Sequence, residues 1–165
     1  MSISASLVKE LREKTSAGMM DCKKALEETK GDFEAAVEWL RVKGLSSAAK
    51  KAGRVAAEGM VTALVKNNVA VVLEVNSETD FVARNDGFKK FVSDVANHIA
   101  TTTATGDILE QAYTADTSKK VSDLLKETIA TIGENLVIRR FEKYNGGANN
   151  FVHTYVHGEG KIGVI

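Results

Sequence analysis

The chain has 165 residues, of which 44% are hydrophobic, and its 22 basic and 22 acidic residues balance to a formal net charge of zero. This length allows one or two domains, and the composition is typical of a globular protein that does not bind nucleic acid over its whole surface. No apolar run is long enough for a membrane span, the N-terminus has no signal or transit pattern, and the single Cys22 excludes an internal disulfide, so we expect a cytoplasmic, reducing environment.

The first fifty residues predict three short helices. Ser4 is placed to cap the first helix, and the second runs from about Met20 to Thr29. The third follows Gly31-Asp32, where the glycine stops the second helix and Asp32 caps the third, and it ends at Gly44. The basic, alanine-rich stretch 46–57 is then interpreted as a helical linker. Three helices in so few residues make a small bundle near the lower size limit for independent folding.

Two adjacent methionines, Met19 and Met20, lie where the first helix gives way to the second. Two neighbouring side chains at a helix start cannot both point into the core, and methionine is favoured on adaptable binding surfaces. We therefore expect the pair to contact a partner. Lys23 and Lys24 follow it, and a solvated face explains these lysines equally well.

The pattern changes to strands after residue 58. Residues 60–65 and 69–75 are rich in β-branched side chains, and Asn67-Asn68 between them predicts a tight hairpin. Asn85 or Asp86 then caps a helix. Its apolar stripe is Phe88, Phe91, Val92, Val95 and Ile99. His98 lies beside this stripe, and we expect it at a polar edge without a chemical role.

The remaining sequence predicts a mobile connection, a helix and several strands. Residues 101–120 are expected to be mobile with one helical piece, and an apolar stripe over 121–132 predicts a helix that stops at Gly133. Strands are predicted at 136–141 and 151–157, and a further strand begins at 163. Because an open apolar strand is a liability for a finished domain, we expect this chain to be a piece of something longer.

The stretch 74–84 leaves a strand and turns abruptly polar. Thr79 or Asp80 is placed to cap a new helix, which would fix the backbone and point the next side chain, Phe81, outward. The alternative is that Phe81 packs into the local core, as most phenylalanines do. Residue type alone favours the core position, without excluding the exposed one.

Two patterns that suggest an enzyme are weak. Residues 158–163 spell a dinucleotide-binding fingerprint, but strand-like residues follow where that motif needs a helix, so a hairpin turn is predicted. His153 and His157 would share one face of a strand, yet no cysteine or carboxylate is spaced to complete a metal site. We expect no enzyme activity, no metal and no cofactor.

Two long segments carry a resemblance to a known family. Residues 11–26, LREKTSAGMMDCKKAL, resemble the N-terminal signature of bacterial translation elongation factor Ts, and residues 74–84, EVNSETDFVAR, resemble its second signature. Later segments around 132–140 and 157–164 are also similar to the family. The resemblance covers nearly the whole chain in the right order, with 101–120 as its weakest part and Ser16 in place of a more usual glycine.

The resemblance implies an α+β fold. It would comprise a three-helix, ubiquitin-associated-like domain over 1–54, a first core subdomain with an antiparallel sheet and packed helices over 55–140, and an incomplete second subdomain over 141–165. The implied activity is guanine-nucleotide exchange on the GTPase elongation factor Tu, which would be the partner. No direct contact with nucleotide, nucleic acid or membrane is implied, and a homodimer through the open strand stays an alternative.

The resemblance also implies site residues. Thr79, Asp80, Phe81 and Val82 would form a wedge that enters the GTPase near its Mg²⁺ and phosphate site. Burying one phenylalanine contributes about 1.5–3 kcal/mol, whereas a ~10⁴-fold shift needs about 5.5 kcal/mol. Further contacts are therefore expected.

These contacts would come from Met19, Met20 and Lys23 in the helical domain and from His157 in the second subdomain. The rival hypothesis is a ubiquitin-associated-like module, or an inactive fragment, that binds the GTPase without exchanging its nucleotide.

Overall fold

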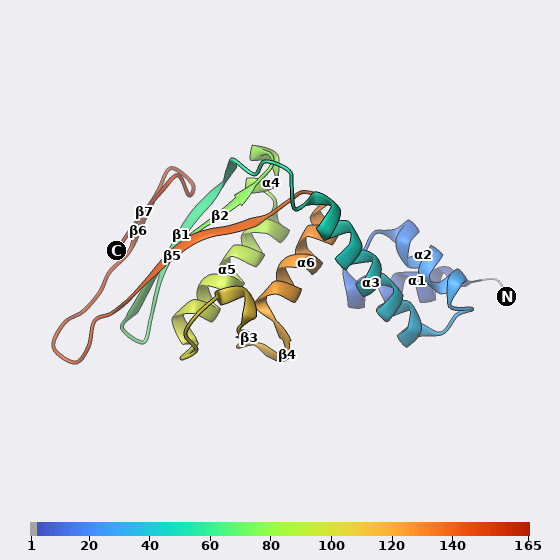
Figure 1. Ribbon diagram of the computed structural model, residues 1–165, viewed down its shortest axis with the longest axis horizontal. Coiled ribbons are helices and arrows are strands. Elements are labelled where there is room, and N and C mark those ends of the chain that lie inside the picture. The colour runs from blue at the N-terminus through green and yellow to red at the C-terminus, as the bar shows by residue number, and fades with distance from the viewer. Residues whose placement is uncertain (1–2) are drawn as a thin grey trace.

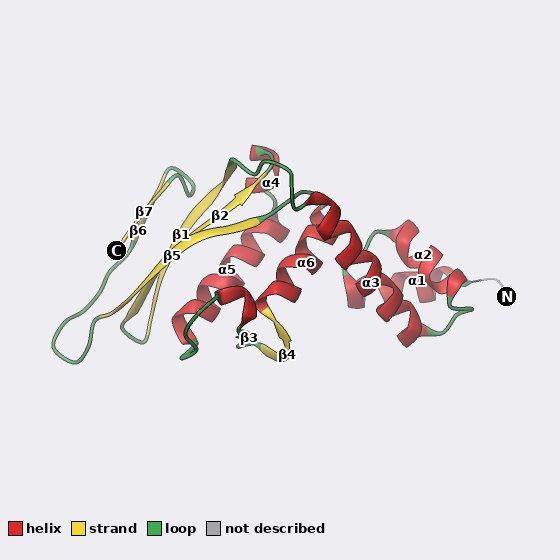
Figure 2. Cartoon of the chain, in the orientation of Figure 1, coloured by secondary structure: helices red, strands yellow, loops and turns green. Residues whose placement is uncertain are grey.

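A computed structural model describes residues 3–165, and these form the α+β fold that was predicted. Three helices come first, followed by a three-stranded antiparallel sheet with two long helices on one face (Figure 1). A C-terminal hairpin lies on the other side of that sheet, so helices, sheet and hairpin form successive layers (Figure 2).

The N-terminal helices are α1 (Ala5–Thr15), α2 (Met19–Glu28) and α3 (Phe33–Lys51), and together they fit a ubiquitin-associated-like domain. The predicted caps are present: the Ser4 hydroxyl accepts from the Leu7 N–H, and the Asp32 carboxylate accepts from the Ala35 N–H. The helices enclose a hydrophobic cluster of their own. Its buried members are Val8, Leu11, Cys22, Ala25, Leu26, Ala36 and Leu40.

The predicted end of the third helix at Gly44 is wrong, because α3 continues to Lys51. Gly44 is buried in this helix, where a Cβ atom would lie only 3.1 Å from the Cβ of Ala130 on the helix at 121–132. Close packing thus explains the glycine. Ala48, one turn later, belongs to the second hydrophobic cluster, so α3 is shared by both clusters. The domain boundary at residue 54 stays a prediction.

The sheet contains β1 (Glu58–Lys66), β2 (Val69–Ser77) and β5 (Val137–Asn145) in the order β1-β2-β5. Asn67 and Asn68 have φ of 51° and 58°, which confirms the predicted hairpin. Asn68 does more than turn the chain, because its side-chain amide donates to the carbonyls of Gly147 and Asn150, each at 2.8 Å. It therefore holds the connection that leaves β5.

Helices α5 (Asp86–Thr101) and α6 (Val121–Ile132) cover one face of the sheet, and the one-turn helix α4 (Asp80–Ala83) precedes them. Asn85 caps α5, and Gly133 ends α6, as predicted. The predicted apolar stripe of α5 is buried against β2. The most deeply buried large side chains of this second cluster are Val71, Leu73, Val75, Phe88, Phe91, Val92, Val95, Ile99, Val121 and Leu136.

The stretch 101–120 contains the expected helical piece, the short 3-10 helix η1 (Ile108–Glu110). It also forms an unpredicted hairpin from β3 (Ala112–Tyr113) and β4 (Asp116–Lys120). Its backbone is fixed through His98 on α5.

The expectation that His98 lies at a polar edge is wrong, because its side chain is fully buried. Its Nδ1 accepts from the Thr114 N–H at 3.2 Å, and its Nε2 lies 3.1 Å from Oε1 of Gln111. These contacts assign the neutral tautomer with the proton on Nε2. Burial lowers the pKa of His98, although the Gln111 hydrogen bond opposes that shift. A satisfied imidazole can therefore be part of the core.

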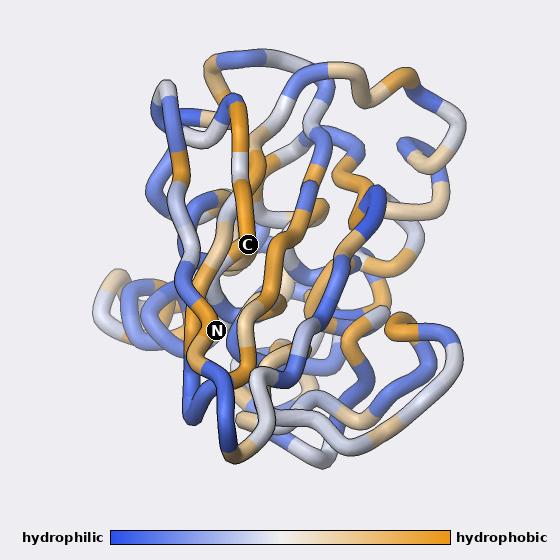
Figure 3. The backbone as a smooth tube through the Cα atoms, turned by 90° about the vertical axis from the view of Figure 1, so that its left-hand side faces the viewer, coloured by the Kyte–Doolittle hydropathy of each residue, from blue (hydrophilic) through white to orange (hydrophobic). Residues whose placement is uncertain are grey.

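The C-terminal hairpin consists of β6 (Tyr155–His157) and β7 (Ile162–Val164), which is shorter than the predicted strand 151–157. Gly158, Glu159 and Gly160 all have positive φ, so the predicted turn is confirmed and the dinucleotide fingerprint is not formed. Figure 3 views the molecule from this side and shows apolar stretches along the strands. Within residues 3–165, no helix has the length and apolar character needed to cross a membrane.

Candidate functional site

The turn after β2 presents an aromatic side chain to solvent. Thr79 has extended backbone angles and caps α4, its hydroxyl accepting from the Val82 N–H at 3.4 Å. Val82 and Ala83 pack against the core, whereas Phe81 is 80% exposed. Since successive helical residues point about 100° apart, anchoring one face of this single turn directs the other outward. The alternative of a core position for Phe81 does not occur.

Asp80 lies beside Phe81 at the start of this turn. Its carboxylate is half exposed and lies 3.5 Å from the guanidinium of Arg84, one turn later. An exposed ion pair of this kind contributes little to stability, because solvent screens it. The carboxylate therefore stays available, and the turn offers an aromatic ring and a negative charge side by side.

The turn is held from a distant part of the chain. The Glu134 carboxylate accepts from the Thr79 N–H at 3.0 Å and from the Thr79 hydroxyl at 2.7 Å. In return, the Glu78 carboxylate accepts from the Asn135 N–H at 2.6 Å. Sequence reasoning did not assign a role to Glu134, because 55 residues separate the partners and no local pattern predicts the contact.

Met19 and Met20 lie at the first two positions of α2 and are 50% and 73% exposed. Gly18 precedes them as N-cap without a side-chain hydrogen bond. Lys23, on the next turn, is about half exposed and lies 3.7 Å from Glu27. This group therefore offers flexible apolar side chains and a cation at a weakly capped helix start.

The structure does not place all predicted site residues together. The methionines belong to the three N-terminal helices (the helical unit), whereas Phe81 belongs to the three-stranded sheet with α4, α5 and α6 (the sheet unit). Helix α3 contributes residues to the hydrophobic clusters of both units. In Figure 1 the end of α3 lies between α4 and α2.

His157 lies apart from both groups, on β6. It is exposed, and its Nδ1 lies 2.9 Å from the Tyr155 hydroxyl. Of the two histidines that were expected on one strand, only His157 is in a strand. Throughout the described residues, no group of three or more His, Cys, Asp or Glu side chains is arranged to hold a metal ion.

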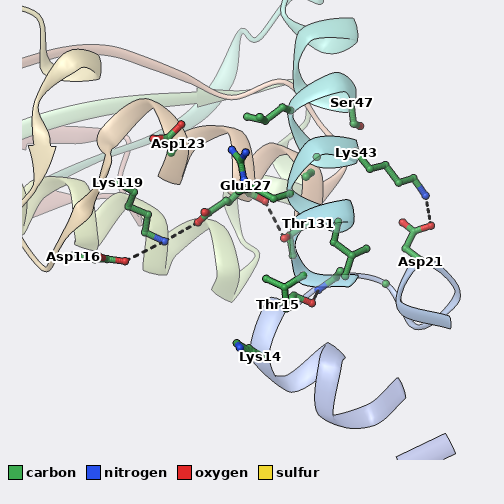
Figure 4. Close-up of a pocket in the computed structure, with 18 of the residues that line it drawn as sticks. Lys14, Thr15, Asp21, Lys43, Ser47, Asp116, Lys119, Asp123, Glu127 and Thr131 are labelled. Carbon is green, nitrogen blue, oxygen red and sulfur yellow. Dashed lines mark hydrogen bonds and ion pairs between the residues drawn. The ribbon is translucent and has the colours of Figure 1, made fainter. Parts of the chain in front are cut away.

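A cleft of about 810 Å³ is lined by residues of the N-terminal helices, of α6 and of β4. Figure 4 shows that two of its lysines pair with carboxylates: Lys43 contacts Asp21, and Lys119 lies between Asp116 and Glu127. Because neighbouring carboxylates neutralise these lysines, we interpret the cleft as a boundary between packed parts of the chain and not as a ligand-binding site. We therefore place the candidate site on the exposed turn and on the start of α2.

Comparisons with known proteins agree with the resemblance of the two signatures. A family model described as "Elongation factor TS" matches residues 78–165. The chain is 68% identical to Elongation factor Ts of Bdellovibrio bacteriovorus over 165 residues, which cover 100% of this chain and 54% of the relative. It is 56% identical to Elongation factor Ts of Clostridium novyi, covering 99% of this chain and 54% of that relative. The chain spans about half the length of the curated relatives it matches.

Proposed function

The chain belongs to the elongation factor Ts family, and on that premise we propose that it promotes the release of GDP from the GTPase elongation factor Tu. It would act in the cytoplasm, during translation elongation, as a guanine-nucleotide exchange factor rather than as a catalyst of a chemical reaction. Both family signatures support this proposal, since they coincide with the two exposed groups of the candidate site.

The observation that carries the proposal is the exposure of Phe81 on an anchored turn. Burying a phenylalanine side chain contributes about 1.5–3 kcal/mol. The fold forgoes that stabilisation and uses hydrogen bonds between Thr79 and Glu134 to hold the turn. A large apolar side chain fixed in this way suits insertion into a partner.

The proposed mechanism is a wedge. Asp80 and Phe81 enter between helices of the GTPase, near the site where backbone amides and Mg²⁺ hold the nucleotide phosphates. Thr79 and Val82 hold the wedge from behind, one as cap and one as anchor. Moving those helices misplaces the groups that grip the phosphates and the metal. By linkage, bound nucleotide weakens the binding of the exchange factor by the same factor.

Other contacts must add to the wedge. One buried phenylalanine supplies about 1.5–3 kcal/mol, and a ~10⁴-fold change in nucleotide affinity needs about 5.5 kcal/mol of differential binding. We assign the remainder to Met19, Met20 and Lys23 on α2 and to His157 on β6. The methionines suit this role because their flexible side chains adapt to a partner surface.

Release of a fluorescent GDP from elongation factor Tu, followed by stopped flow with substoichiometric amounts of this chain, tests the proposal. We expect each molecule to act on many GTPases. Phe81→Ala should slow release about 10- to 100-fold, the equivalent of one lost phenylalanine contact, with little change in melting temperature. Phe151→Ala is the matched control, because Phe151 is similarly exposed and lies on the connection between β5 and β6. Unchanged release with Phe81→Ala would contradict the wedge.

A passive binding module is the second candidate. The exposed methionines on a ubiquitin-associated-like unit favour it, because such a unit can bind a partner without changing it. A passive module would affect GDP release only in proportion to its own concentration. The same titration therefore separates the two functions.

A further inference from the structure

The corner between α6 and β5 places two polar residues beside the wedge. Gly133 ends α6 at φ +91°, a left-handed conformation that glycine adopts without strain. Leu136, almost fully buried, anchors the chain as β5 begins. Between these fixed points, Glu134 and Asn135 have little freedom, so their directions are set by the fold.

The corner and the turn exchange hydrogen bonds reciprocally. Glu134 accepts with one carboxylate oxygen from the Thr79 N–H and with the other from the Thr79 hydroxyl. Glu78, from the turn, accepts from the Asn135 N–H. Each segment thus supplies one carboxylate acceptor and donates a backbone N–H to the carboxylate of the other. Hydrogen bonds with a charged acceptor are roughly twice as strong as neutral ones, so this pair of segments is held firmly.

Glu134 also determines how Thr79 caps the turn. A threonine hydroxyl has one hydrogen to donate and lone pairs with which to accept. Donation of that hydrogen to Glu134 fixes the rotation of the hydroxyl, while a lone pair of the same oxygen accepts from the Val82 N–H. A single turn of helix is not stable by itself. The direction of α4, and with it the direction of Phe81, therefore depends on this cap.

The same corner holds the segment that arrives from the helical unit. The Asn135 side-chain amide donates to the Arg54 carbonyl at 2.8 Å, and the Arg54 guanidinium lies 3.5 Å from Glu78. Asn135 is buried, so its amide is committed to this contact. The corner consequently joins three segments: the end of the linker, the turn before α4 and the start of β5.

From these contacts we infer that Glu134 is a positioning residue for nucleotide exchange, acting by fixing Thr79 and thereby aiming Phe81. The inference rests on the proposed exchange function and deepens it. In this inference Glu134 does not itself contact the GTPase. Its effect is preorganisation: the turn is held in its binding direction before the partner arrives, which removes an ordering cost from association.

Substitutions of Glu134 test the inference through GDP release from elongation factor Tu. Glu134→Ala removes both acceptors and should slow release about tenfold, in line with the loss of a charged hydrogen bond. Glu134→Gln should have a smaller effect, because its amide oxygen can still accept from one of the two donors. Glu142→Ala is the matched control, since this exposed glutamate lies on neighbouring β5, and release should be unchanged.

A double-mutant cycle with Phe81→Ala separates positioning from general stability. If Glu134 acts by aiming the ring, Glu134→Ala causes no further slowing once the ring is absent. Equal slowing in both backgrounds would overturn the inference, because a structural role does not depend on Phe81. If Glu134→Ala does not fold at the assay temperature, Glu134→Gln carries the same cycle.

The outcomes also distinguish this inference from the exchange function. Normal release with Glu134→Ala, together with slow release with Phe81→Ala, overturns the positioning role and leaves the wedge intact. Normal release with Phe81→Ala overturns both. Only slow release in each single variant, without an additional loss in the double variant, supports the inference.

Discussion

The two exposed apolar groups of the candidate site are supported in opposite ways. Phe81 stands on a turn with a side-chain cap, and a carboxylate 55 residues away in the sequence holds that cap. Met19 and Met20 stand on a helix that begins at Gly18, without a side-chain cap. A phenylalanine has two side-chain torsions, whereas a methionine has three and a polarisable sulfur. The phenylalanine group is thus stiff, whereas the methionine group has more flexible side chains on a helix start that lacks a side-chain cap.

This difference indicates a division of labour between the groups. A stiff contact loses little entropy on binding, but it fits only one shape of receptor. A soft contact loses more rotamer freedom when buried, and it adapts to many shapes. Four experiments would test whether the two groups differ in this way.

Gly44→Leu should disturb the relation between the two groups most. Its side chain would enter the contact of α3 with α6, where even a Cβ atom lies 3.1 Å from Ala130. Overpacking of this kind costs about 2 kcal/mol, measurable by urea unfolding, and GDP release should slow because the two groups lose their fixed spacing. Gly53→Leu is the control, since a Cβ atom at that position would meet no other part of the chain within 4 Å. Equal stability of both variants would contradict the tight contact.

Leucine substitutions at the two groups should separate stiff from soft. Phe81→Leu is expected to slow GDP release about tenfold, because a smaller side chain on a fixed backbone cannot move to refill its receptor. Met20→Leu should change release less than about twofold, since this exchange conserves volume and the surroundings adapt. Stopped-flow release measures both. Similar losses would show that the groups do not differ in stiffness.

Acid should weaken the unit that carries the wedge and spare the helical unit. Residues 1–54 contain no histidine, whereas the sheet unit buries His98. Burial, reinforced by Lys143, lowers the pKa of His98 against the Gln111 hydrogen bond. As the pH falls below about 6.5, the unfolded chain takes up a proton that the folded chain refuses. Stability should therefore fall by at most about 1.4 kcal/mol per pH unit until the folded pKa is reached.

Urea unfolding between pH 7.5 and 5.5 measures this slope. His153→Gln, which alters an exposed histidine, should leave it in place. His98→Gln should remove it, although the variant will be less stable at every pH because Thr114 loses its acceptor. A slope that persists in His98→Gln would assign the pH dependence to another group.

The smallest expected effect comes from stiffening the soft group. Gly18→Ser would supply the side-chain cap that α2 lacks, and its Cβ has room, with the nearest atom 4.0 Å away on Asp21. A serine cap in place of glycine adds a few tenths of a kcal/mol, measurable as a small rise in melting temperature. Lower stability would mean that Gly18 is needed for its backbone and not merely tolerated.

Local rules predicted much of the fold from the sequence. The caps at Ser4, Asp32 and Asn85, the Asn67-Asn68 hairpin and the stripe of α5 all follow from contacts within a few residues. The errors lie where distant packing decides. Gly44 lies within a helix and not at its end, and its small size is explained by the close approach of Ala130. His98 can be buried because Gln111 and Thr114 satisfy both of its ring nitrogens.

The candidate site divides in the same way. The cap at Thr79 and the exposure of Met20 were predictable from neighbouring residues. Residue type alone favoured a buried Phe81, so the resemblance was needed to expect it outside. The role of Glu134 had no local signal, since its contact with Thr79 spans 55 residues. Its partner is visible only when the corner after α6 and the turn before α4 are seen together.

Helix α3 has a consequence for the partner as well as for the fold. Its 19 residues extend about 28 Å and are packed into both hydrophobic clusters. A rod of this kind sets one separation between the methionines and the aromatic ring. A GTPase whose receiving surfaces shift relative to each other during its cycle can then engage both only in one of its shapes. The chain would bind preferentially to the GTPase conformation whose two receiving surfaces have the same separation as the methionines and the ring. It would dissociate when the GTPase adopts another conformation.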